Sequence, residues 1–214
     1  AQASAESMPY SALLLLTSGG PARQLLNPAP TAEMAEVFED LVVAASAALL
    51  GPGANAVRFG WPSKIGRPPE FYGAIEWLAG RMGIKPGSAY RPPRRKDGGV
   101  DVVAWHPFPD GRSGFPVMLV QCTLQGEVIT KASDVDTRYW AGWLTLDNEP
   151  ATALAIPQTI PAGVIWDEVA VRTLILERIR IAGLLGTAIA HVGLDDLVAS
   201  QLAELSELLG AAES

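Results

Sequence analysis

Two polar side chains stand at the facing ends of two apolar runs in the middle of the chain. Asp101 directly precedes the run 102–105, and Gln121 directly follows the run 117–120. The segment 107–114 between them, Pro-Phe-Pro-Asp-Gly-Arg-Ser-Gly, is rich in turn formers. This pattern predicts two neighbouring antiparallel strands, which bring Asp101 and Gln121 to one point. A carboxylate and an amide oxygen at one point are suitable ligands for a hard divalent cation.

The sequence around these residues resembles the PD-(D/E)XK, or restriction-endonuclease-like, superfamily, and is closest to its Mrr-like branch. The similarity lies in the string 97–101, Asp-Gly-Gly-Val-Asp, and in the string 121–123, Gln-Cys-Thr. In the family pattern the Asp binds a divalent metal, and the Glu or Gln of the next strand and the backbone carbonyl after it complete the oxygen ligands. The resemblance therefore implies that Asp101, Gln121 and the carbonyl of Cys122 hold Mg²⁺ or Mn²⁺.

The family pattern also has a lysine two positions after the Gln, and here that position holds Thr123. Some members of the superfamily carry this lysine in the following helix, which makes Lys131 the candidate. A Glu from the helix that precedes the strands often reaches the metal in this superfamily. By its placement Glu76 is the candidate for that role, and the alternative is a solvated carboxylate on a helix face. Because Gln121 carries no charge, we expect metal binding to be weak without substrate phosphate.

The net charge of −7 does not favour general binding to a polyanion, so any nucleic-acid surface must be local. One dense basic cluster lies directly before the Gly-Gly segment, at Arg91, Arg94, Arg95 and Lys96. Beside a phosphodiesterase site we expect it to contact phosphates, and the alternative is a solvated loop. Asp97 is open to three interpretations, as a turn residue, a second metal ligand or a supporting carboxylate, of which the turn is favoured.

Other chemistries have little support in the sequence. There is no phosphate-binding Gly-x-x-x-x-Gly-Lys-Ser/Thr loop, and one cysteine with two distant histidines cannot form a structural zinc site. A Cys122 nucleophile paired with His106 or His191 is disfavoured, because the resemblance makes Cys122 a strand residue that points away from the pocket. A single cysteine suits a reducing compartment, and we see neither a secretory leader nor an apolar run long enough to cross a membrane. We therefore expect a cytoplasmic protein.

The apolar spacing predicts an α/β fold. The resemblance implies a restriction-endonuclease-like core, in which extra N- and C-terminal helices accompany a central mixed sheet flanked by helices. The predicted helices are 31–50, 68–83, 131–143, 166–185 and 194–209. The predicted strands are 102–105, 117–121 and 151–156, and 12–16 is a short strand or a docked segment. We expect 51–66 to be a loop. The predicted organisation is an N-terminal helical extension (1–60), a nuclease-like core (61–160) and C-terminal helices (161–214), together one compact domain that could be excised from a longer protein.

The resemblance implies a metal-dependent DNA endonuclease domain, of the kind that serves restriction or anti-phage defence. Its expected partners are DNA and other domains or subunits of a larger defence complex, with an oligomer possible and no membrane. The alternative is a catalytically inactive module of the same fold that binds nucleic acid or a protein partner. Thr123 and the acidic net charge favour the alternative, whereas Asp101, Gln121, Lys131 and the basic cluster favour the nuclease.

Overall fold

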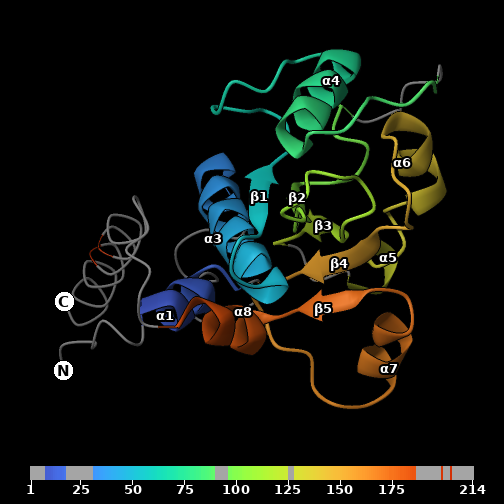
Figure 1. Ribbon diagram of the computed structural model, residues 1–214. Coiled ribbons are helices and arrows are strands. Elements are labelled where there is room, and N and C mark those ends of the chain that lie inside the picture. Colours follow the sequence, from blue (N-terminus) through green and yellow to red (C-terminus); the bar gives the residue numbers. More distant parts are fainter. Residues whose placement is uncertain are drawn as a thin grey trace, which may run out of the picture.

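A five-stranded mixed sheet with helices on both faces forms the centre of the molecule (Figure 1). The computed structural model describes residues 8–17, 31–89, 96–124 and 128–186, and the single positions 199 and 203. The mixed sheet flanked by helices confirms the predicted α/β class. The predicted helix 194–209 lies outside the described residues, apart from those two positions.

Strands that are consecutive in the chain are also neighbours in the sheet, in the order β1-β2-β3-β4-β5. The strands are β1 (Asn55–Arg58), β2 (Val102–Trp105), β3 (Val117–Cys122), β4 (Ala151–Ala155) and β5 (Leu174–Leu176). The pairs β1–β2 and β2–β3 are antiparallel, whereas β3–β4 and β4–β5 are parallel. The predicted antiparallel pairing of 102–105 with 117–121 and the predicted strand at 151–156 are thus confirmed.

Helices α1 (Met8–Leu15), α3 (Ala32–Leu50) and α8 (Arg178–Leu185) pack on one face of the sheet, against alternate residues of β2 to β5. The central helix of this layer, α3, starts where the sequence predicts. Thr31 Oγ1 accepts a hydrogen bond from the Met34 N–H at 3.2 Å, and Gly51 ends the helix. Its buried stripe of Met34, Phe38, Leu41, Val42 and Ala45 faces the sheet, which fixes the helix against the strands that carry the site.

Helices α4 (Phe71–Met82) and α6 (Thr137–Trp143) cover β1 to β3 on the opposite face. Further along the same face, α5 (Val128–Lys131) and α7 (Val164–Ala170) cover β4 and β5. The layer under α4 and α6 is rich in aromatic rings that meet edge to face. Phe59 lies 5.3 Å from Trp140 and 6.4 Å from Phe71, measured between ring centroids. These contacts give the end of β1 a rigid support.

Two short strands differ from the sequence predictions. The segment 51–66, expected to be a loop, contains β1, which pairs with β2 along its whole length. The segment 166–185, expected to be one long helix, contains α7, β5 and α8. Pairing with β4 buries Ile175 and Leu176 in the sheet, and this burial outweighs the local preference for a continuous helix.

The helices of two further segments differ from the sequence predictions. Residues 12–16, expected to be a strand or a docked segment, lie at the end of α1 and just beyond it, with Ala12, Leu13 and Leu16 buried. The single helix expected at 131–143 is divided into α5 and α6, because Asp136 caps a new helix by accepting from the N–H groups of Arg138 and Tyr139. Lys131 therefore ends α5 and does not begin a long helix.

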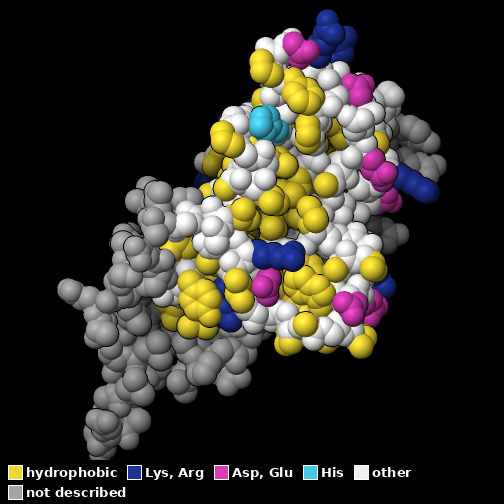
Figure 2. All heavy atoms as spheres, turned by 60° about the horizontal axis from the view of Figure 1, so that its bottom comes forward, with side chains coloured by type: hydrophobic (Ala, Val, Ile, Leu, Met, Phe, Trp, Pro, Cys, Tyr) yellow, Lys and Arg dark blue, Asp and Glu magenta, His cyan; other side chains and the backbone are white. Residues whose placement is uncertain are grey.

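Figure 2 turns the lower side of Figure 1 toward the viewer, and hydrophobic side chains gather over this face. An open apolar groove of about 470 Å³ lies between α8, the last turn of α3 and strands β3 to β5. Its lining includes Leu50, Met118, Leu176 and Leu184, with Arg180 as a charged side chain. None of the described helices combines the length and the hydropathy that crossing a bilayer requires.

Candidate functional site

Asp101 lies at the start of β2, where backbone bonds tie it to both neighbouring strands. Its N–H donates to the Val120 carbonyl at 2.9 Å, and its carbonyl accepts from the N–H groups of Phe59 and Gly60. Its side-chain Oδ2 accepts from the Cys122 N–H at 2.7 Å. Asp101 is thus fixed between the ends of β1 and β3, next to the segment that carries Gln121.

Glu39, on α3, brings a second carboxylate to the same place. A Cβ atom added to Gly60 would lie 3.2 Å from Glu39 Oε2 and 3.3 Å from Asp101 Oδ1. Both carboxylates therefore approach Gly60 closely, and a glycine here leaves room for their oxygens. Two carboxylates that approach one point suit a small cation.

The raised pKa of Glu39 also indicates a place where a cation would be stabilised. Burial and then the nearby charge of Asp101 raise its pKa from the ordinary 4.5 to about 8, while Arg58 acts in the opposite direction. Arg58 ends β1 and is only 5% exposed, and its Nε lies 3.7 Å from Glu39 Oε2. At neutral pH the protein alone therefore favours a proton on Glu39, which a divalent cation would displace.

Gln121 and Lys131 meet at a third carboxylate, that of Asp134. Its Oδ2 accepts from Gln121 Nε2 at 3.1 Å and from Lys131 Nζ at 3.2 Å. Lys131 is only 23% exposed, so its ammonium is held near the end of β3. The bond to Asp134 also fixes the orientation of the Gln121 amide, whose Oε1 is buried and accepts no hydrogen bond within the described residues.

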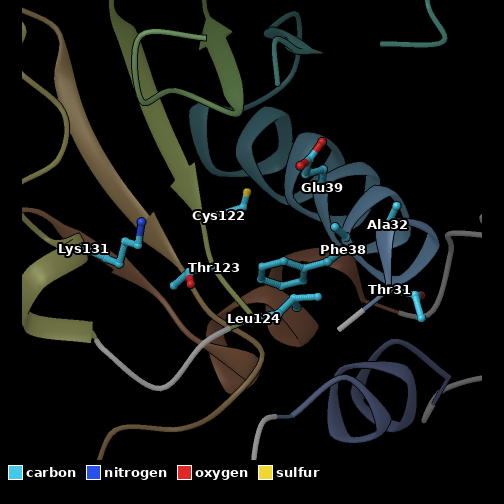
Figure 3. A pocket seen from close by; sticks show the side chains of 9 residues that line it. Thr31, Ala32, Phe38, Glu39, Cys122, Thr123, Leu124 and Lys131 are labelled. Atoms are coloured by element: carbon cyan, nitrogen blue, oxygen red, sulfur yellow. The ribbon is translucent and has the colours of Figure 1, made fainter. Parts of the chain in front are cut away.

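A cavity of about 320 Å³ lies between α3 and the end of β3. Its lining includes Phe38 and Glu39 from α3, Cys122 to Leu124, and Lys131. Figure 3 shows the Glu39 and Lys131 side chains on either side of the segment that ends β3. The cavity therefore connects the Glu39 side of the site with the lysine, and a phosphate group in it would lie between them.

Cys122 is poorly suited to act as a nucleophile. Burial, and then the charges of Asp101 and Glu39, raise the pKa of its thiol well above the ordinary value. His106, one of its two candidate partners, has Nδ1 2.9 Å from the Leu50 carbonyl oxygen, and His191 lies outside the described residues. The sulfur of Cys122 is therefore a poor candidate for the reacting atom.

The donor set fits a magnesium-like ion and not a zinc-like one. Nowhere in 31–89, 96–124 or 128–186 do three His, Cys, Asp or Glu side chains come together as a metal-binding group. Mg²⁺ needs fewer protein ligands, because it keeps several waters and takes one or two carboxylates together with substrate phosphates. Glu39 and Asp101 are the residues that would supply those carboxylates, and Gln121 Oε1 is a buried oxygen without a hydrogen-bond partner among the described residues.

The other predicted site residues are placed as follows. Glu76 lies on the exposed side of α4, whereas Glu39, on α3, is the helix carboxylate that lies with Asp101 near Gly60. Thr123 is buried and lines the cavity without supplying a charge. Asp97 forms the expected turn, because its Oδ1 accepts from the Gly99 N–H at 2.8 Å and Gly99 has a φ of 80°.

In the predicted basic cluster the structure describes only Lys96. Its ammonium lies 5.0 Å from the centroid of the Trp61 ring, beside the segment that follows β1. Arg91, Arg94 and Arg95 lie outside the described residues. Glu39 and Arg58 were not singled out from the sequence. Glu39 could have been predicted as a Glu on the helix that precedes the first strand. No local sequence pattern distinguishes Arg58.

Comparison with known protein families, with curated proteins and with solved structures gives no match to this chain.

Proposed function

We propose that this chain is a metal-dependent deoxyribonuclease domain with a restriction-endonuclease-like core. The observation that carries the proposal is the pair of carboxylates, Glu39 and Asp101, that both approach Gly60 closely. Support comes from the mixed sheet flanked by helices and from the position of α3 before the strands, as the resemblance to this superfamily implies. The Asp101 and Gln121 positions of the motif lie on adjacent strands.

In this proposal Glu39, Asp101, Gln121 Oε1 and the Cys122 carbonyl would hold Mg²⁺ or Mn²⁺. Bound there, the ion would neutralise phosphate charge and favour ionisation of the attacking water. The ammonium of Lys131, which Asp134 holds beside Gln121, stabilises the negative charge that develops on the phosphate oxygens. Lys131 thus supplies the positive charge that Thr123 cannot.

Asp101 has a second role in this arrangement. Its bond to the Cys122 N–H fixes the end of β3 relative to the start of β2. A strand residue in a hydrogen-bonded pair directs its N–H and C=O to the same side, so the Cys122 carbonyl is expected to face Asp101. One carboxylate would therefore both bind the ion and position another ligand.

The second candidate function is a catalytically inactive module of the same fold that binds nucleic acid or a protein partner. The ion pair between Lys131 and Asp134 favours it, because a lysine used only to satisfy a structural carboxylate would leave the site without a catalytic charge. Proposals that the domain serves restriction or anti-phage defence, or acts in the cytoplasm, depend on the nuclease activity and follow only if it is found.

The test is cleavage of plasmid and linear DNA with Mg²⁺, with Mn²⁺ or with EDTA, for the wild-type protein and four variants. We expect the wild-type protein to cut with metal only, and Asp101→Ala and Glu39→Ala to lose at least about a hundredfold in rate. Glu76→Ala is the matched control, since it removes the same carboxylate from an exposed helix position, and it should cut normally. Lys131→Ala should also fail to cut. A wild-type protein that binds DNA but never cuts it would favour the second candidate.

A further inference from the structure

An exposed tryptophan directly follows the glycine that both carboxylates approach. Gly60, which borders Glu39 and Asp101, is followed directly by Trp61, and the indole of Trp61 is 37% exposed. The Phe59 and Gly60 N–H groups both donate to the Asp101 carbonyl, at 2.6 and 2.9 Å. The backbone that carries Trp61 is therefore fixed to the same residue that anchors the candidate metal site.

Two cations lie near this indole. Lys96 Nζ is 5.0 Å from its ring centroid and Arg67 Cζ is 5.6 Å away. Arg67 is itself buried. Its guanidinium lies 4.4 Å from the Phe59 ring centroid and donates a hydrogen bond to the Lys96 carbonyl. The aromatic ring and the positive charges are thus held together as one unit in a chain whose net charge is −7.

An exposed aromatic ring with adjacent cations matches the chemistry of an unpaired nucleotide. A base stacks on the ring with little regard to its identity, and the Lys96 ammonium attracts its phosphates. In a continuous duplex both faces of each base are already stacked on neighbouring bases. A ring of this kind therefore selects for bases that have no stacking partner, as in single strands, overhangs and junctions.

We propose that Trp61, with Lys96 beside it, is a stacking platform for an unpaired base and that the candidate nuclease site prefers single-stranded DNA or DNA with a single-stranded segment. The inference rests on the proposed function, because it names the substrate class of that site. It is independent of the metal chemistry, since stacking needs no divalent ion.

The experiment measures binding in EDTA, so that no cutting occurs. Fluorescence anisotropy follows the binding of labelled oligo(dT), and of the same strand paired with oligo(dA), to the wild-type protein and to three variants. Trp61→Ala should weaken binding of oligo(dT) about 5- to 100-fold and leave duplex binding nearly unchanged. Trp61→Phe should retain most of the affinity, because a smaller ring can still stack.

Trp166→Ala is the matched control. Trp166 has the same kind of cationic neighbour, with Arg180 Cζ 4.7 Å from its ring centroid, but it belongs to α7 in the part of the fold that covers β4 and β5. This variant should bind oligo(dT) as the wild-type protein does. Equal losses for single-stranded and duplex DNA in Trp61→Ala, or no loss, would overturn the stacking proposal and leave the proposed function standing. Absence of binding to either DNA by the wild-type protein would overturn both.

Discussion

The carboxylates of Glu39 and Asp101 come from different layers of the fold and both approach Gly60 closely. Glu39 reaches it from α3, and Asp101 from the start of β2. Burial, and then the nearby charge of Asp101, raise the pKa of Glu39 to about 8. Such a pair is stabilised either by a shared proton or by a bound cation.

The first prediction concerns stability without metal. Because the Glu39 pKa is raised from 4.5 to about 8, the folded protein holds a proton that the unfolded chain releases within this range. The contribution of Glu39 to the free energy of unfolding is therefore complete below pH 4.5 and is lost as the pH rises toward 8. Urea unfolding at several pH values in EDTA should show this decline. Glu39→Gln, which has no proton to lose, should flatten it, and an unchanged slope in that variant would contradict the assignment.

The second prediction concerns competition between the proton and the metal. Below the Glu39 pKa of about 8, binding of a divalent ion must release a proton. The affinity for Mn²⁺ should therefore rise with pH, by up to about tenfold per unit, and level off above pH 8. Titration calorimetry in two buffers with different ionisation enthalpies measures the proton release directly. Binding without release at pH 6 to 7 would place the ion away from Glu39.

Arg58 provides the third prediction. Its guanidinium lowers the pKa of Glu39 and lies 3.7 Å from the Glu39 carboxylate. Arg58→Met keeps much of the side-chain volume but removes this charge, so the pKa of Glu39 should rise further. The pH midpoint for Mn²⁺ binding should then move upward. Arg112→Met, at an exposed ion pair with Asp110, is the control and should leave the midpoint unchanged.

Gly60 provides the fourth prediction. In Gly60→Ala the new methyl group would lie 3.2 Å from Glu39 Oε2 and 3.3 Å from Asp101 Oδ1, so both carboxylates must move apart by a few tenths of an ångström. We expect weaker Mn²⁺ binding by about 10- to 100-fold, comparable to the loss of a supporting group around a metal. Gly80→Ala is the matched control, because a Cβ at this helical position meets no atom within 4 Å. It should bind Mn²⁺ normally and be slightly more stable.

The fifth prediction separates catalysis from DNA binding. Lys131→Ala should lower the cutting rate about 10²- to 10³-fold and leave DNA affinity largely intact, because one ammonium acts mainly on the charge that develops during the reaction. The measurement combines single-turnover cleavage with anisotropy binding. Lys85→Ala, at an exposed position, is the control for a general loss of positive charge. Normal cutting by Lys131→Ala would show that this lysine has a structural role with Asp134 only.

Much of the fold could be predicted because its signals are local. Thr31 and Gly51 mark the ends of α3, and the apolar runs around Asp101 and Gln121 mark β2 and β3. The strand β1 has only four residues and lies among glycines and prolines, so its strand character comes from pairing with β2 and not from its own sequence. The strand β5 has only three residues, and its strand character likewise comes from pairing with β4.

The residues of the candidate site also differ in whether a local sequence signal marks them. Asp101 and Gln121 could be found from the sequence, because each adjoins a strand and the two strands form a hairpin. Glu39 is one of several acidic residues on an amphipathic helix, and only the packing of α3 on the sheet distinguishes it from the others. Glu76 belongs to α4, which packs on the opposite face and presents this residue to solvent, as the alternative interpretation of a solvated carboxylate expects.

The most direct test of the shared cation site is a crystal of the protein soaked in Mn²⁺ and measured at a wavelength where manganese scatters anomalously. The account predicts an anomalous peak between the carboxylates of Glu39 and Asp101, over Gly60, with Gln121 Oε1 or the Cys122 carbonyl completing its oxygen ligands. No peak there at a saturating concentration of Mn²⁺, or a peak bound only to other residues, would contradict it.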